Sequence, residues 1–222
     1  MTSAGTPAPA GPKEAVLRLY QHRAAMYDLE LSAFEPLRQQ AIDALALQTG
    51  DGVLDVGCGT GLSFSALEDR IGPTGRITGI EQSPDMLERA RQRVAQHQWG
   101  NIDLIEDAAA SAPLSGMADA MLLHFTHDIV RQPAALTHLF AHLKPGARVV
   151  STGLKWAPPW CGAVNLYVLS AALYSVSSLE GLEEPWSLLE THLSDFSLVP
   201  VMWGAGYVAC GRARPTPVRR AT

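Results

Sequence analysis

Apolar and polar positions alternate in two different ways along residues 52–152. Short apolar runs, which predict buried strands, are separated by segments with apolar residues every three or four positions, which predict amphipathic helices. The expected strands are 52–56, 76–81, 101–106, 118–124 and 147–152. The expected helices between them are 62–71, 84–97 and 133–143. Strands alternating with helices of this length predict βαβ units and a parallel sheet.

The flanking regions follow other patterns. Two helices are expected before the sheet and two after it, at 13–27, 34–48, 163–175 and 185–192. The strand-like runs 197–203 and 207–212 lie close enough in sequence to pair as an antiparallel hairpin on the sheet edge. Two local signals add detail: Ser83 precedes Pro84 as a helix N-cap, and Lys144-Pro-Gly146 is expected to end the helix before it.

Composition narrows the class of protein. The chain has 222 residues, 47% of them hydrophobic, which excludes a wholly disordered chain. A net charge of −5 and a pI near 5.8 argue against a nucleic-acid binder.

The cysteines and the apolar runs suggest a compartment. Cys58, Cys161 and Cys210 form no CxxC pair, so we expect neither a disulfide framework nor a metal site. The longest apolar stretch, Gly162–Val176, is shorter than the roughly 20 residues that a membrane span needs. With no secretory signal in the first dozen residues, the sequence predicts a cytoplasmic protein without stable membrane insertion.

A glycine-rich turn follows the first strand and reads Asp55-Val-Gly57-Cys-Gly59-Thr-Gly61. Glycines there permit positive φ and let a ligand approach the backbone, while amides at the helix start can face it. Ligands of parallel sheets bind beyond the carboxyl ends of the strands. The spacing is GxGxG, whereas a dinucleotide fingerprint is GxGxxG.

Residues 53–61 resemble the glycine-rich motif of class I S-adenosylmethionine-dependent methyltransferases, of the small-molecule type similar to ubiquinone/menaquinone-biosynthesis methyltransferases. Further matches run in the family's order from about residue 50 to 152, with 119–128 resembling its fourth strand and 143–146 the start of its fifth. The resemblance implies a Rossmann-like α/β fold. We therefore expect a seven-stranded, mostly parallel sheet with an antiparallel edge hairpin, helices on both faces and an N-terminal helical cap.

The resemblance also implies a donor site. Glu81 matches the acid that holds both ribose hydroxyls in this family, and Asp107 matches the position that meets the adenine amino group. The residues expected to bind S-adenosylmethionine, with S-adenosylhomocysteine as product, are Tyr20, Tyr27, Asp55, Gly57, Gly59, Gly61, Glu81, Gln82, Met86, Asp107, Ala108 and His124.

Some of these positions have other interpretations. Glu81 alone could be a surface charge, and Asp107 could cap a helix after it. Tyr20 and Tyr27 are seven residues apart and share one helix face, so they could equally pack onto the domain.

Catalysis in this family needs little chemistry from the protein, because the donor methyl is already activated. The acceptor atom must be held about 3–3.5 Å from the methyl, and a base is needed only if that atom keeps a proton. His124 and His127 follow the fourth strand and are the candidate bases. His124 could instead be a non-catalytic feature of this loop.

Aromatic residues after the fifth strand suggest an acceptor lid. Trp156, Trp160, Asn165 and Tyr167 are the candidate acceptor-binding residues, suited to a flat or apolar molecule, although several could be core. Helix 163–175 could also face another subunit or a membrane surface, but it lacks the Lys/Arg face typical of membrane-surface helices.

The sequence therefore predicts one methyltransferase domain over 13–212 between tails at 1–12 and 213–222. Its expected parts are a cap (13–49), a donor-binding core (50–152), an acceptor lid (153–195) and an edge hairpin (196–212). The expected reaction is methyl transfer to N or O of a small molecule, by a monomer or homodimer, without metal or nucleic acid. The alternatives are a non-catalytic donor-binding regulator or scaffold and, less directly, an NAD-dependent enzyme.

Overall fold

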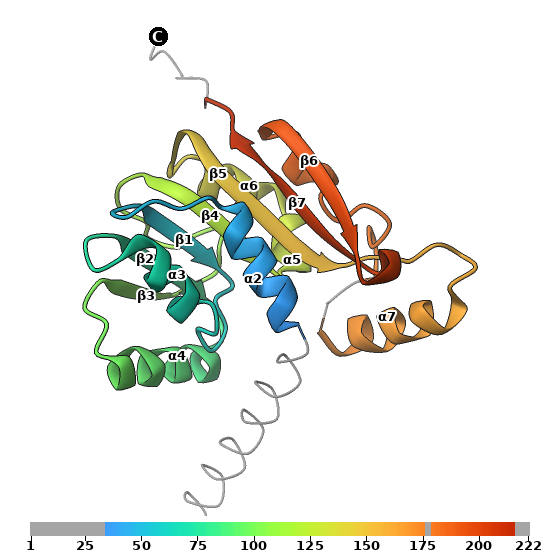
Figure 1. Cartoon of the computed structure of the whole chain (residues 1–222), viewed down its shortest axis with the longest axis horizontal. Coiled ribbons are helices and arrows are strands. Elements are labelled where there is room, and N and C mark those ends of the chain that lie inside the picture. Colours follow the sequence, from blue (N-terminus) through green and yellow to red (C-terminus); the bar gives the residue numbers. More distant parts are fainter. Residues whose placement is uncertain (1–33, 176–178, 216–222) are drawn as a thin grey trace, which may run out of the picture. The chain divides into compact units, whose positions relative to one another are not determined.

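A seven-stranded mixed sheet forms the centre of the computed structural model, which describes residues 34–175 and 179–215 (Figure 1). The strand order is β3-β2-β1-β4-β5-β7-β6; the first five are parallel, and β7 pairs antiparallel with both β5 and β6. The strands are β1 Gly52–Val56, β2 Arg76–Glu81, β3 Ile102–Glu106, β4 Ala118–His124, β5 Leu143–Leu154, β6 Leu193–Val201 and β7 Gly206–Ala213.

Helices lie on both faces of the sheet. They are α2 Glu35–Ala44, α3 Phe64–Ile71, α4 Pro84–His97, α5 His127–Val130, α6 Pro133–Phe140, α7 Gly162–Ser175, α8 Ser187–Glu190 and the short 3₁₀ helix η1 Met202–Gly204. The chain divides into two compact units, Met1–Pro36 and Leu37–Thr222, and all that follows concerns the second.

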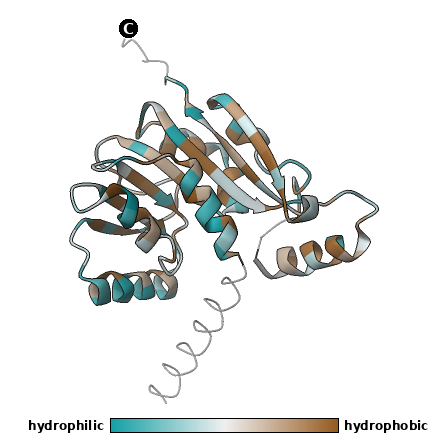
Figure 2. Cartoon of the chain, in the orientation of Figure 1, coloured by the Kyte–Doolittle hydropathy of each residue, from teal (hydrophilic) through white to brown (hydrophobic). Residues whose placement is uncertain are grey.

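Two apolar clusters hold these helices against the sheet. One contains side chains of α2, α3 and α4 and is represented by Ile42, Phe64 and Leu87, all fully buried. The other contains side chains of α5, α6 and α8 and is represented by Leu136 and Leu189. In β4, Met121 and Leu123 enter the second cluster and Leu122 enters the first, as the pleat requires. Figure 2 shows the consequence, with brown apolar strands inside and a mostly teal outer surface on α4.

The expected sheet, the edge hairpin and the helices on both faces are confirmed. Strands 52–56, 76–81 and 118–124 and helix 84–97 have the expected bounds. The expected helix 13–27 lies outside the described residues.

The segment around Lys144-Pro-Gly146 differs from expectation. The helix ends at Phe140 and β5 begins at Leu143, so these three residues belong to the strand and do not precede it. They lie where the register between β4 and β5 shifts, between the pairs Ala118–Leu143 and Ala120–Arg148. Such a bulge takes up extra residues in one strand, which is how proline and glycine fit there.

A buried hydroxyl pair links the parallel and antiparallel parts of the sheet. Ser151 of β5 and Tyr207 of β7 have their oxygens 3.2 Å apart, and both side chains are almost fully buried. Trp186 packs edge-on against the Tyr207 ring. A buried hydroxyl that loses its partner costs more than the net value of the bond.

Tyr207→Phe should therefore lower the free energy of unfolding by about 1–3 kcal/mol, because Ser151 is left unpaired. The double variant Tyr207→Phe/Ser151→Ala should lose less than the sum of the two single variants. Urea unfolding of the four proteins measures this coupling; additive losses would show that the pair contributes no specific stability.

Candidate functional site

The strand order reverses between β1 and β4. β1 runs on through β2 and β3 toward one edge of the sheet, whereas β4 runs on toward the other, and all five parallel strands end on the same side. The loops after β1 and β4 therefore diverge at a topological switch point, where open parallel sheets bind ligands.

The glycine turn after β1 is shaped by two close approaches and one open space. Gly57 and Gly61 have positive φ, and an added Cβ would collide with the Thr126 methyl and the Phe64 ring respectively. Gly59 also has positive φ, at 56°, but a Cβ there would meet no atom within 4 Å. The turn is thus packed at its two ends and open at its middle glycine, where a ligand can approach the backbone.

Glu81 joins the glycine turn to the start of α4. One carboxylate oxygen accepts the Gly59 amide at 3.1 Å, and the other accepts the Ser83 amide at 2.8 Å. Ser83 occupies the N-cap position as expected, but its side chain makes no cap bond. Each carboxylate oxygen has a further lone pair, so Glu81 can still accept from ligand hydroxyls while these amides fix its position.

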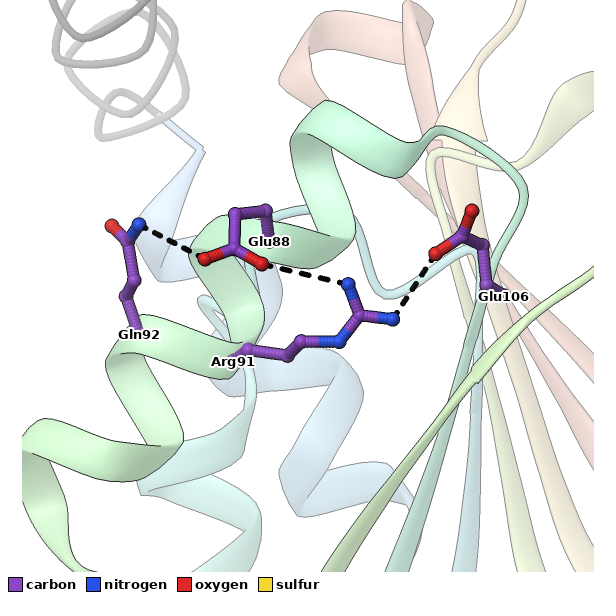
Figure 3. Close-up of polar contacts among 4 residues, drawn as sticks. All are labelled: Glu88, Arg91, Gln92 and Glu106. Carbon is purple, nitrogen blue, oxygen red and sulfur yellow. Dashed lines mark hydrogen bonds and ion pairs between the residues drawn. The ribbon is translucent and has the colours of Figure 1, made fainter.

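Glu106, which pairs with Glu81 in the β2–β3 register, has a different environment. Figure 3 shows its carboxylate facing Arg91, at 3.1 Å, with Arg91 also 3.6 Å from Glu88. These side chains are half exposed, so the network has a small energetic effect. Two adjacent glutamates at neighbouring strand ends therefore differ in kind: one is held by backbone amides, the other by surface ion pairs.

Asp107 follows β3 directly. Its Oδ1 accepts from the Ala108 amide and the Ser111 hydroxyl, both at 2.7 Å. These bonds close a turn, and no helix follows between residues 108 and 117, so the alternative of a helix cap is wrong. Gln82 is exposed, while Met86 and Ala108 are partly buried near the same strand ends.

Asp55, at the end of β1, is a buried acid. The residue is 2% exposed, and its Oδ2 has no hydrogen-bond partner. Burial raises the pKa of Asp55 to about 7, opposed by the nearby Arg38 charge and reinforced by the Glu81 charge. A buried carboxylate oxygen without a partner is costly unless a ligand supplies a donor or a positive charge.

Arg38 of α2 is the cation whose charge lowers the pKa of Asp55, and it is itself only 3% exposed. Its charge also acts on His124. A buried arginine is rare unless a charge balances it, and Arg38 in an amphipathic helix was not recognised from the sequence. The signal that could have found it is an arginine at a position that the helical period assigns to the buried face.

His124 ends β4 and contacts the neighbouring strand. Its Nδ1 lies 2.5 Å from the Thr152 hydroxyl of β5, while its buried Nε2 has no partner. Burial and, to a smaller extent, the Arg38 charge together lower the pKa of His124 to about 3. The imidazole is therefore neutral at physiological pH.

The backbone after His124 is strained. Phe125 has φ of 56°, a region that a bulky residue seldom adopts, and its amide donates to the Thr152 carbonyl. Thr126 then places its methyl against Gly57 and buries a hydroxyl without a hydrogen-bond partner. Strain of this kind is concentrated at functional sites.

His127 begins α5, a helix that the sequence did not predict. Its Nε2 lies 3.1 Å from the Glu180 carbonyl oxygen, which can only accept, so Nε2 carries the proton in this bond. Nδ1 is buried and has no partner. The contact ties the segment that follows α7 to the loop that follows β4.

The acceptor candidates lie around α7. Asn165 uses its side chain internally, accepting from the Ala157 amide and donating to the Ala157 carbonyl. Trp156 is partly buried, whereas Trp160 is 84% exposed and Tyr167 is exposed. Tyr20 and Tyr27 lie outside the described residues.

Two other side-chain groups bear on the predicted site. Burial raises the pKa of the Cys58 thiol, which disfavours the reactive thiolate. Within residues 34–175 and 179–215, no group of three or more His, Cys, Asp and Glu residues is arranged to hold a metal ion.

S-adenosylmethionine fits the residues present. The open space at Gly59 leaves room beside the turn, and the unpartnered Asp55 oxygen suits a positively charged group. Glu81 offers acceptors to hydroxyl groups at a fixed position.

Comparison with known proteins agrees with this geometry. Residues 53–146 match the family model described as a methyltransferase domain. A demethylmenaquinone methyltransferase of Staphylococcus aureus is 30% identical over 145 residues, which is 62% of this chain and 59% of that protein. The Listeria monocytogenes protein of the same name is 28% identical over 134 residues, 59% of this chain and 56% of that one. The chain thus spans less than two thirds of the length of these relatives.

Solved structures share the fold at low sequence identity. An O-methyltransferase family protein from Burkholderia thailandensis has a TM-score of 0.65 at 16% identity, covering 86% of this chain and 59% of its own. The N-methyltransferase NodS from Bradyrhizobium japonicum, in complex with S-adenosylhomocysteine, has a TM-score of 0.59 at 17% identity, covering 81% and 87%. Together with the family match, the strand order and the glycine turn, these likenesses identify residues 53–146 as part of a class I S-adenosylmethionine-dependent methyltransferase domain, distantly similar to the demethylmenaquinone methyltransferases.

Proposed function

We propose that the chain transfers a methyl group from S-adenosylmethionine to nitrogen or oxygen of a small molecule. The observation that carries the proposal is the switch-point site itself, where the unpartnered Asp55 oxygen, the open face of Gly59 and the anchored Glu81 lie on adjoining strand ends.

The donor supplies a methyl group on a sulfonium, which needs no further activation. In the proposed arrangement, Glu81 accepts from the ribose hydroxyls, and Asp107 with Ala108 lies toward the adenine. Asp55 faces the positively charged amino group of the donor, and the Arg38 charge acts on Asp55 from α2. The protein's main contribution is to hold the acceptor in line and to exclude water.

The two histidines contribute differently to this proposal. A neutral imidazole with a pKa of about 3 is a weak base. His124 is therefore better suited to a hydrogen bond with the acceptor than to removing a proton from the acceptor. In His127 the bond from Nε2 leaves the Nδ1 lone pair as the acceptor of a proton. If the acceptor atom loses a proton, His127 is the better-placed of the two.

A small acceptor is supported by the likeness to demethylmenaquinone methyltransferases, which are named for a small-molecule acceptor. Of the aromatic candidates, the partly buried Trp156 supplies a face suited to a flat or apolar molecule, whereas Trp160 and Tyr167 are exposed. Incubation with labelled donor and a metabolite extract, followed by mass spectrometry, should reveal a methylated small molecule; labelling of protein or RNA alone would contradict the proposal.

Donor binding should depend on Glu81 and not on Glu106, its partner in the β2–β3 register. Glu81→Gln keeps the size of the side chain but replaces one acceptor oxygen by a donor, so we expect about 10- to 100-fold weaker binding of S-adenosylhomocysteine. Glu106→Gln is the matched control, because it removes the adjacent charge from surface ion pairs alone. Isothermal calorimetry measures both; equal affinities in the two variants would remove Glu81 from the site.

Donor affinity should fall in acid because Asp55 has a pKa of about 7 in the free protein. Below pH 7 a growing fraction of the carboxyl is protonated and neutral, so affinity should fall by about tenfold per pH unit. Asp55→Asn should bind more weakly and lose this step. A wild-type binding profile that stays flat between pH 5.5 and about 8 would refute the assignment.

Turnover should not require protonation or deprotonation of His124 near neutrality, since its pKa is about 3. We expect His124→Asn to lower turnover while donor affinity changes less than about threefold. Between pH 5 and about 8, the pH profiles of turnover of the wild type and of this variant should have the same shape. If His124→Asn removes a step near pH 6.5, His124 acts as an ordinary titrating base and this interpretation is wrong.

A further inference from the structure

Two stretches of the chain carry no charged residue at all. Residues 156–179 and 196–211 lack Asp, Glu, Lys, Arg and His. Nine large apolar side chains are exposed in the described chain, and all but Met117 lie in these two stretches. Exposed apolar residues are normal when scattered, but a contiguous group marks an interaction site.

Contacts between the two stretches bring them together. Ala157, Val168 and Ala205 form a small buried cluster that joins the loop after β5, helix α7 and the end of η1. The Lys155 amide donates to the Ala205 carbonyl, and a Cβ on Gly204 would contact Pro158. Figure 1 shows α7 beside η1 at this end of the sheet. We call the exposed group around this cluster the apolar tip; its residues are Trp160, Leu166, Tyr167, Leu173, Met202 and Trp203.

Helix α7 is apolar on both of its faces. Val168 and Ala172 are buried against the domain, while Leu166 and Leu173, seven residues apart, are exposed on the other side. Figure 2 shows α7 in brown and pale colours. A helix that is apolar all round is normally covered on all sides, so the exposed side of α7 is a candidate contact surface.

The backbone holds Trp203 in an exposed position. Met202 and Trp203 have φ of 52° and 55°, although neither is glycine, and the Trp203 side chain is 86% exposed. Left-handed backbone at bulky residues costs free energy and persists where it has a use. Trp160, on the adjoining loop, is 84% exposed. Tryptophan is the residue enriched at the boundary between water and lipid, because its ring is apolar and its N–H can remain hydrated.

Two polar side chains of α7 bond to the backbone beside the tip. Asn165 bonds to the backbone of Ala157 and Pro158, and the Ser170 hydroxyl donates to the Leu166 carbonyl. The Lys155 ammonium donates to the carbonyls of Trp156 and Gly204 at the base of the tip. A protein partner would require a rim of polar groups, with about one hydrogen bond per 100–200 Å². Of the six tip residues, Trp160, Trp203 and Tyr167 carry a polar group, and none of the six is charged. Such aromatic side chains suit the boundary of a lipid layer, where the ring is in an apolar phase and its N–H or O–H stays hydrated.

We propose that the apolar tip docks this protein onto a lipid surface, with Trp160, Trp203 and the outer face of α7 entering the uncharged acyl boundary. Docking of this kind places side chains in one face of a membrane and does not require a helix that crosses it. No helix in the described ranges is long and apolar enough to cross a membrane. The missing Lys/Arg face of α7 is consistent with the proposal, because the inner side of the helix packs on the domain and has no need of polar residues. Lipid binding should therefore be independent of anionic headgroups and of salt.

Flotation of the full chain with phosphatidylcholine vesicles tests this directly. The wild type should float with these neutral vesicles equally at low and high salt. Trp203→Ser combined with Leu173→Ser should reduce the bound fraction by at least about tenfold, since each side chain loses its apolar transfer energy. Met117→Ser is the matched control, because it removes an exposed apolar side chain outside the tip and should leave flotation unchanged.

Three outcomes would overturn the proposal. The first is no flotation of the wild type; the second is equal flotation of the tip variant and the control. The third is a dimer by sedimentation equilibrium that the tip variant abolishes, without vesicle binding, which would assign the tip to a second copy of the chain. Thermal unfolding confirms that the variants are folded, and calorimetry of S-adenosylhomocysteine on the same samples separates failure of lipid docking from failure of the methyltransferase proposal.

Discussion

The buried carboxylate of Asp55 is the constraint around which the site is arranged. It is the last residue but one of β1, in a position where water is excluded and one oxygen has no partner. Burial of an acid is tolerable only with a compensating charge or with protonation. Arg38 supplies part of that compensation from α2, and a bound cationic group would supply more. The same unpaired carboxylate therefore lowers the stability of the free protein and favours binding of the donor.

The surrounding loops follow from the same constraint. The turn after β1 must pass close to Thr126 and Phe64, which only glycines at 57 and 61 allow. Glu81 fixes the middle of that turn from the next strand. On the other side of β1, the strained Phe125 lets the chain turn from β4 into α5. The proposed donor site is consequently held by backbone contacts at Gly57 and Gly61 and open at Gly59.

The remainder of the molecule is organised differently. Past β5, the chain forms a small cluster around Ala157 and Val168 that is separate from the two large clusters of the sheet. Apolar residues there face outward as well as inward. The donor site is thus formed by the sheet and its turns, whereas the tip presents a surface whose chemistry suits an external apolar phase.

Periodicity was sufficient to predict the sheet and its edge hairpin, because strand ends are local consequences of residue type. The glycine turn led to the proposed donor site at the ends of these strands. The helix 84–97 and three strands have the expected bounds for the same reason. Long-range contacts decided the rest. The bulge that includes Pro145 depends on the register with β4, and the low pKa of His124 depends on burial beside Arg38, 86 positions earlier in the chain. Neither burial nor register is a property of a short segment, so only the tertiary structure distinguished Glu81 from Glu106, identified Arg38, and showed that α7 leaves apolar side chains exposed.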